Sequence, residues 1–143
     1  MKLVFDATFG EPWVVHLRGF FMNHSSPRPL IRHLFEIAGE EERDDIVWVP
    51  KLARLGCAVV SGDRGTHSRP FERLPRICAK ERVTHILLSA NMHNNAGKFE
   101  RARAIIVLWH EILAACRDTP GSRYQVMAID NTYRRFALVR KPA

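Results

Sequence analysis

The sequence predicts an α/β fold in which a mainly parallel central sheet is flanked by helices. Two observations lead to this fold class. Short apolar runs alternate along the chain with segments of helical periodicity. The runs near positions 3, 57 and 86 have no polar alternation, as is typical of strands buried on both faces. Strand–helix–strand units of this kind build parallel sheets through right-handed crossovers.

The first third of the chain predicts a strand, a helix and one ambiguous segment. Leu3-Val4-Phe5 is an apolar run that ends at Asp6, as expected for a buried strand feeding a loop. Segment 30–38 is compatible with a strand or a helix. Pro12 suits the first turn of a helix, and the apolar side chains after it have helical spacing: Trp13, Leu17, Phe20 and Phe21.

The middle of the chain predicts a second helix and a second buried strand. An acidic cluster at 40–45 precedes apolar residues with helical spacing, and Gly56 is a suitable helix end. Asp45 is therefore expected at or just before a helix N-terminus. Residues 57–61 form the next apolar run, which leads through Gly62 to Asp63. Asp63 thus repeats the position of Asp6 at the end of a strand.

The second half predicts further helices and strands. We expect a helix at 71–80, a core strand at 86–88, and two strands at 124–129 and 133–139 joined through Asp130-Asn131. One long helix is expected from an apolar stripe made of Phe99, Ala102, Ile106, Trp109, Leu113 and Cys116.

Composition indicates one globular, cytoplasmic domain over 1–143. The 143 residues are 46% hydrophobic and 26% charged, which excludes a disordered tail. Cys57, Cys78 and Cys116 have no close pairing and suit buried thiols in a reducing compartment. The N-terminal apolar run is too short for a signal peptide or a membrane span, so no membrane association is expected.

The charge is unevenly distributed. Residues 1–63 contain 7 Lys or Arg against 9 Asp or Glu, whereas residues 64–143 contain 15 against 6. A basic half favours a polyanionic partner, because cations that neutralise phosphates release counterions. A solvated basic surface explains the charge equally well.

Several other classes of site are disfavoured. The chain has no Gly-x-x-x-x-Gly-Lys phosphate loop and no Gly-x-Ser-x-Gly elbow. Its seven histidines have no close zinc-type spacing.

The carboxylates of Asp6, Asp45 and Asp63 are the candidate site. Two follow strands and one begins a helix, and in parallel sheets such positions meet at the carboxyl edge. Carboxylate oxygens are the ligands that Mg²⁺ and Mn²⁺ prefer. The alternative is that each Asp is only a loop former or a helix cap.

Three segments resemble the PIN-like nuclease family, specifically VapC-type toxin relatives. They are Lys2 to Asp6, Asp45 to Ala53 with its Asp-x-x-Trp start, and Gly56 to Arg64 with its strand-ending Asp. The resemblance implies a three-layer sandwich and a Mg²⁺- or Mn²⁺-dependent endoribonuclease, with Asp6, Asp45 and Asp63 as catalytic and metal-binding residues. It also implies a cognate antitoxin protein and a homodimer.

The chain departs from that family at one place. Many relatives have a fourth acid close to the third, but here Asp63 is followed by Arg64-Gly65-Thr66. The alternative function is therefore a non-catalytic RNA- or protein-binding module with a degenerate acidic site.

Cations near the third Asp are the candidate RNA-binding residues. Arg64, Arg69 and Arg76 follow Asp63 and are suited to phosphate contacts. A solvated helix face is the competing interpretation for this group, and it is favoured for Arg101 and Arg103 in the long helix.

Overall fold

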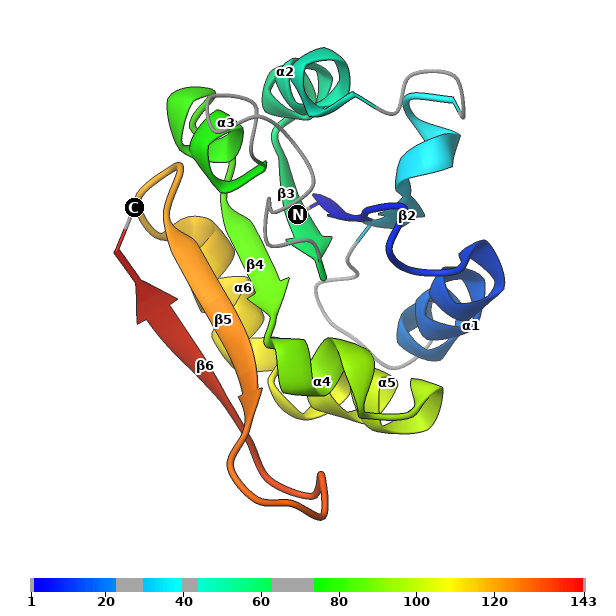
Figure 1. The fold of residues 1–143 in the computed structure, drawn as a ribbon. Helices are drawn as coiled ribbons and strands as arrows, with labels where there is room; N and C mark the ends of the chain where they lie inside the picture. Colours follow the sequence, from blue (N-terminus) through cyan, green and yellow to red (C-terminus); the bar gives the residue numbers. More distant parts are fainter. Residues whose placement is uncertain (1, 23–29, 40–43, 63–73, 143) are drawn as a thin grey trace.

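The computed structural model describes residues 2–22, 30–39, 44–62 and 74–142. Within these ranges the strands form one six-stranded sheet in the order β2-β1-β3-β4-β5-β6 (Figure 1). The first five strands are parallel, and β6 pairs antiparallel with β5. The strands are β1 (Lys2–Phe5), β2 (Leu30–His33), β3 (Cys57–Ser61), β4 (His85–Leu88), β5 (Arg123–Ala128) and β6 (Phe136–Lys141).

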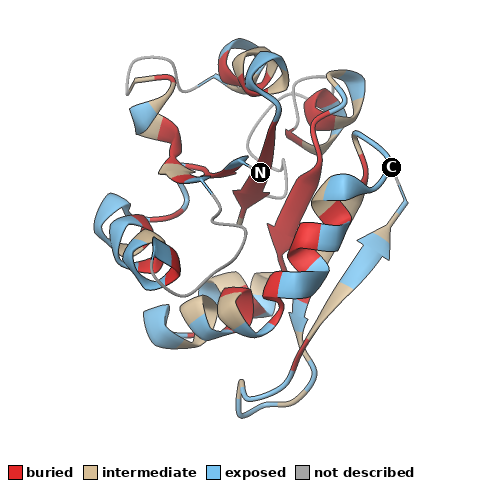
Figure 2. Cartoon of the chain, turned by 180° about the vertical axis from the view of Figure 1, so that it is seen from behind, coloured by how far each residue is buried: buried red, intermediate tan, exposed pale blue. Residues whose placement is uncertain are grey.

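Helices cover both faces of this sheet. They are α1 (Glu11–Met22), the 3₁₀ helix η1 (Leu34–Glu36), α2 (Asp45–Leu55), α3 (Leu74–Lys80), α4 (Ala90–Asn94), α5 (Lys98–Val107) and α6 (Trp109–Arg117). Figure 2 shows buried central strands and helices whose outer sides are exposed. None of the helices in the described ranges has the length and apolarity needed to cross a bilayer. The predicted α/β fold with a mainly parallel sheet between helix layers is confirmed.

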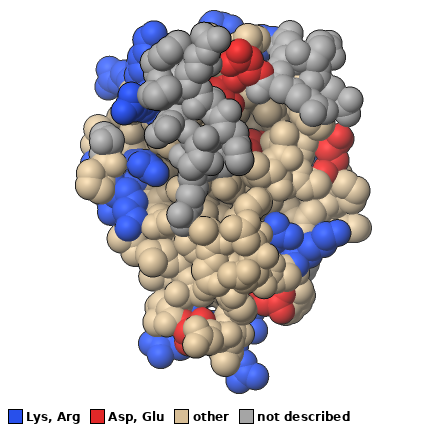
Figure 3. All heavy atoms as spheres, in the orientation of Figure 1, with Lys and Arg blue, Asp and Glu red and all other residues tan. Residues whose placement is uncertain are grey.

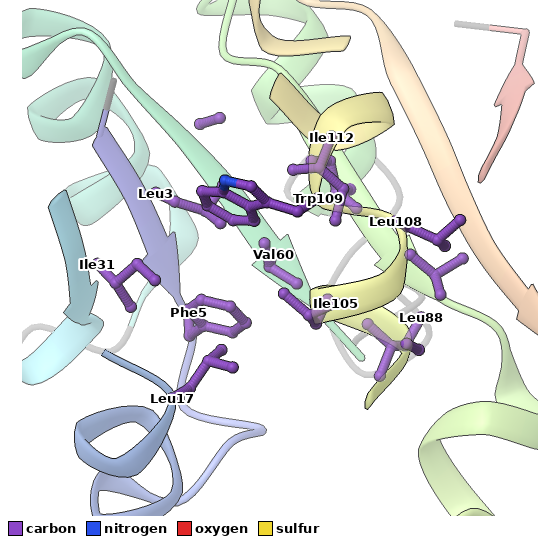
Figure 4. Close-up of a cluster of buried hydrophobic side chains, with 14 of the residues drawn as sticks. Leu3, Phe5, Leu17, Ile31, Val60, Leu88, Ile105, Leu108, Trp109 and Ile112 are labelled. Carbon is purple, nitrogen blue, oxygen red and sulfur yellow. The ribbon is translucent and has the colours of Figure 1, made fainter. Parts of the chain in front are cut away.

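The larger core lies between the sheet and α1, α5 and α6. Leu3 and Phe5 of β1 point into it, toward Leu17 of α1 and Ile105 of α5 (Figure 4). Trp109 of α6 packs on Phe21, with the ring centroids 4.1 Å apart. Burial of these large side chains supplies the main driving force for docking the three helices.

The smaller core lies on the opposite face, under α2 and α3. Because side chains alternate along a strand, Val4 and Val59 face this side, where they meet Trp48 of α2 and Cys78 of α3. Each of these four side chains is at most 2% exposed. Two separate cores on the two faces of one sheet define three layers.

Helix α2 has a well-defined beginning and end. The Asp44 carboxylate accepts a hydrogen bond from Ile46 N at 3.1 Å, so Asp44 is the N-cap and Asp45 the first helical residue. At the other end Gly56 has a φ of 68°, a left-handed conformation that favours glycine. The predicted position of Asp45 at a helix start is confirmed.

The single long helix predicted across 99–116 is wrong. The chain forms two helices, which Leu108 separates with φ −89° and ψ 14°. The β-branched run 105–107 is weak helix sequence. Trp109 and Leu113 of the predicted stripe are buried as expected, but the core also takes residues outside that stripe. Phe99, expected in the stripe, is 72% exposed, whereas Ala104, Ile105 and Ile112 are fully buried.

Three other segments differ from expectation. The ambiguous segment 30–38 contains both a strand and a 3₁₀ turn, and the short helix α4 was not predicted. Strand β6 starts later than expected, because the Asp130 carboxylate accepts hydrogen bonds from the backbone N–H groups of Thr132 and Arg134 and so holds a turn. Phe20, predicted in the stripe of α1, is 46% exposed.

Candidate functional site

The candidate site lies where the strand order reverses. From β1 the chain crosses to β2 on one side, and β3 lies on the other side of β1. In open parallel sheets the crevice at the carboxyl ends of two such strands is the usual place for a binding site. Asp6 directly follows β1, and Gly62 directly follows β3. Both loops therefore start at this crevice.

The loop after β1 holds the Asp6 carboxylate in a fixed position. Asp6 is only 4% exposed. Its Oδ1 accepts hydrogen bonds from the backbone N–H of Thr8, at 3.0 Å, and from the Thr8 hydroxyl. Its backbone N–H donates to the Val60 carbonyl at 3.1 Å. A buried carboxylate needs such partners, because an unpaired one is costly to desolvate.

Thr8 also connects this loop to the end of β3. The Thr8 Oγ1 accepts a hydrogen bond from the backbone N–H of Gly62 at 3.0 Å. The segments 6–8 and 60–62 are thereby tied together at the crevice. Thr8 was not predicted as a site residue, although an Asp followed two positions later by a Thr is a familiar turn pattern.

Asp45 lies on the same face of the sheet as the smaller core. Only Gly56 separates α2 from β3, so the helix runs back along the sheet and its N-terminus approaches the carboxyl edge. Burial raises the pKa of the Cys78 thiol, and the negative charges of Asp45 and Asp6 raise it further. The negative charges of both carboxylates therefore affect the same buried thiol, which lies between the sheet and α3.

The remaining predicted residues have a mixed outcome. Asp63, Arg64 and Arg69 lie outside the described residues, so the three-Asp site stays a prediction. Among the described residues there is no group of three His, Cys, Asp or Glu side chains that could hold a metal ion. Arg76 is exposed near the beginning of α3.

The donor chemistry at Asp6 and Asp45 fits a hard divalent cation. Both side chains offer carboxylate oxygens, and Mg²⁺ commonly takes one or two protein carboxylates and keeps several waters. Carboxylate oxygens favour Mg²⁺ or Mn²⁺, whereas sulfur and imidazole ligands favour zinc.

His93 of α4 packs against the end of β3. A Cβ added at Gly62 would overlap the imidazole ring of His93. The ring also makes an edge-on contact with Phe9, with centroids 6.2 Å apart. His93 was not predicted as a site residue, because the helix that carries it was not predicted.

Comparison of the chain with protein-family models, with curated proteins and with solved structures found no match.

Proposed function

We propose that this protein is a Mg²⁺- or Mn²⁺-dependent endoribonuclease with a PIN-like fold. The observation that carries the proposal is the buried Asp6 carboxylate at the crevice between β1 and β3, with Asp45 on the same face of the sheet. Carboxylates at that point of a parallel sheet, such as the buried Asp6, are suited to a metal ion that acts on a phosphate.

Asp6, Asp45 and Asp63 are the proposed ligands of the ion. When bound, the ion would lower the pKa of a coordinated water and offset charge that develops on the phosphodiester. The hydrogen bonds from Thr8 orient the Asp6 carboxylate before any ligand arrives. Such preorganisation is what electrostatic catalysis requires.

The basic half of the chain supports RNA as the substrate. Residues 64–143 carry 15 of the 22 Lys and Arg residues, and the chain has a net charge of +7. Arg64, Arg69 and Arg76 are the proposed phosphate contacts, since a guanidinium binds phosphate oxygens with two parallel hydrogen bonds.

A cleavage assay on total cellular RNA tests the proposal. Purified protein should cut RNA with Mg²⁺ or Mn²⁺ and stop when EDTA is added. Asp6→Asn and Asp63→Asn should each lower the rate by at least about 100-fold. Asp44→Asn is the matched control, because it removes one adjacent charge but keeps a good N-cap. Equal activity of wild type and Asp63→Asn would exclude this mechanism.

The biological role we propose is the toxin of a bacterial toxin–antitoxin pair. A cell that expresses the wild-type chain alone should stop growing, and the Asp63→Asn chain should have no such effect. Coexpression of a small protein encoded in the neighbouring reading frame should restore growth. Continued growth with the wild-type chain, at verified expression, would remove the toxin assignment and leave the nuclease assignment to the cleavage assay.

The second candidate is a non-catalytic module that binds RNA or protein. It is favoured by the sequence after Asp63, where Arg64-Gly65-Thr66 offers no fourth acid. This candidate predicts RNA binding that is indifferent to EDTA, together with no cleavage under any metal.

A further inference from the structure

A cavity of about 270 Å³ lies beside the Asp6 loop, between the start of α1 and the start of α5. Thr8, Gly10 and Trp13 line one side, and Lys98 and Arg101 line the other. Thr8 is also the residue that hydrogen-bonds to Asp6. The cavity and the candidate metal site therefore share a wall. Figure 3 shows basic side chains on the flank where α1 and α5 approach each other.

The apolar wall of this cavity is rigid. The Trp13 indole N–H donates to the Lys98 carbonyl at 2.9 Å, which ties α1 to the first turn of α5. One face of the indole is stacked on Phe9, with ring centroids 5.0 Å apart and an interplanar angle of 21°. The Phe5 ring contacts the same indole, with ring centroids 5.5 Å apart. The wall is held from two sides, so the cavity exists before a ligand binds.

The opposite wall carries positive charge that no carboxylate among the described residues pairs with. Within the described part of the chain, neither Lys98 nor Arg101 forms an ion pair. The Nε of Arg101 is buried and has no hydrogen-bond partner among the described residues. The carboxylate of Glu100 lies against Gly97 at the helix start. A buried guanidinium nitrogen without an acceptor is costly.

These features favour an anion over a nucleobase. The Phe9 ring already covers one face of Trp13, which leaves less aromatic surface for stacking a base. A phosphate group would supply acceptor oxygens to the unsatisfied Nε of Arg101 and to the ammonium of Lys98.

We propose that the cavity lined by Trp13, Lys98 and Arg101 binds a phosphodiester of a single-stranded RNA, next to the phosphodiester placed at Asp6. RNA as the ligand rests on the proposed function. The subsite fixes the direction in which the strand leaves the metal site, from the Thr8 loop toward α5. The subsite gives Arg101 and Arg103 different roles. From the sequence, both were expected on a solvated face, and in the structure Arg103 is exposed.

Equilibrium binding of a short oligoribonucleotide in EDTA tests the subsite without cleavage. Arg101→Ala should weaken binding about tenfold and reduce the slope of log affinity against log salt by about 0.7. Arg103→Ala is the matched control, since it removes the same charge two positions away on α5 and should change neither quantity. Lys98→Ala, at an exposed position where folding is not at risk, should also weaken binding.

Indole fluorescence gives an independent readout. Trp48 and Trp109 are only 2% and 5% exposed, so the half-buried Trp13 is the indole best placed to report on the cavity. Saturation with RNA should change the emission of the wild-type protein but not that of Trp13→Phe.

Each outcome has a distinct meaning. Equal affinities for Arg101→Ala, Lys98→Ala and Arg103→Ala would overturn the subsite even if the wild type cleaves RNA. Loss of affinity in Arg101→Ala and Lys98→Ala alone supports the subsite even if no cleavage occurs, in which case only the proposed nuclease activity fails. If a nucleoside monophosphate changes the Trp13 fluorescence with the same affinity as the oligoribonucleotide, the cavity is a mononucleotide site and the proposal is overturned.

Discussion

The hydroxyl of Thr8 and the backbone N–H of Gly62 are joined by a 3.0 Å hydrogen bond across the crevice. The same hydroxyl donates to the Asp6 carboxylate. Replacing Thr8 by Val keeps the side-chain shape but removes both bonds. We expect the free energy of unfolding to fall by about 1 kcal/mol, as measured by urea denaturation. Thr8→Ser keeps the hydroxyl and should retain more stability; equal losses in the two variants would show that the hydroxyl does not link the loops.

Metal binding should be visible as added thermal stability. With Mn²⁺ at about 100 times its dissociation constant, ligand linkage predicts a rise in Tm of roughly 5 to 10 °C. Asp6→Asn and Asp45→Asn should lose this rise, whereas Asp44→Asn should keep it because Asn also caps helices. A rise that persists in Asp6→Asn would place the ion elsewhere.

The contact between Gly62 and His93 predicts a steric coupling. A methyl group at Gly62 would overlap the His93 ring, so Gly62→Ala should lower the free energy of unfolding by roughly 1 to 3 kcal/mol. His93→Ala vacates that space, and the double variant should be more stable than the sum of the single effects implies. Additive losses in the double-mutant cycle would mean that the chain relieves the overlap in another way.

His85 predicts a specific dependence of stability on pH. Burial lowers the pKa of His85 from 6.5 to about 3, and the positive charge of Arg123 contributes to the shift. Between about pH 3 and pH 6.5, His85 therefore binds a proton in the unfolded chain more strongly than in the folded chain. The stability conferred by neutral His85 is therefore complete above about pH 6.5 and is lost as the pH falls toward 3.

The variant His85→Leu isolates this contribution. Both ring nitrogens of His85 lack hydrogen-bond partners within the described ranges, so Leu should cost little at pH 7. At pH 5 the variant should exceed the wild type by roughly 2 kcal/mol more than it does at pH 7. His16→Gln, at an exposed position, is the control. Parallel pH profiles of wild type and His85→Leu would contradict the assignment.

Strands were more predictable from the sequence than helices. The strand at 57–61 has its predicted bounds because an apolar run lies between two glycines, Gly56 and Gly62. The helix expected over 99–116 was wrong because the apolar periodicity continues through Trp109 and does not mark the break at Leu108. Helix α4 was missed because five residues are too few to display a periodicity.

The candidate site was predictable only where it follows from strand order. Asp6 lies at the carboxyl end of β1, as the general rule for parallel sheets requires. The bond between Thr8 and Gly62 joins positions 54 residues apart and has no local signature. The surroundings of Arg101 could not be predicted from the sequence either, because Trp13, which lines the same cavity, comes from another helix.

Because a single glycine joins α2 to β3, a small rotation at this glycine becomes a larger displacement at the far end of the helix. Eleven residues of helix at about 1.5 Å each separate Gly56 from Asp45 by roughly 16 Å. A tilt of roughly 10° at the glycine would displace the far end of such a rod by roughly 3 Å, more than a metal–oxygen bond length of about 2.1 Å. Gly56→Ala, which forces a side chain into the left-handed conformation, would thus misalign a carboxylate that it never touches.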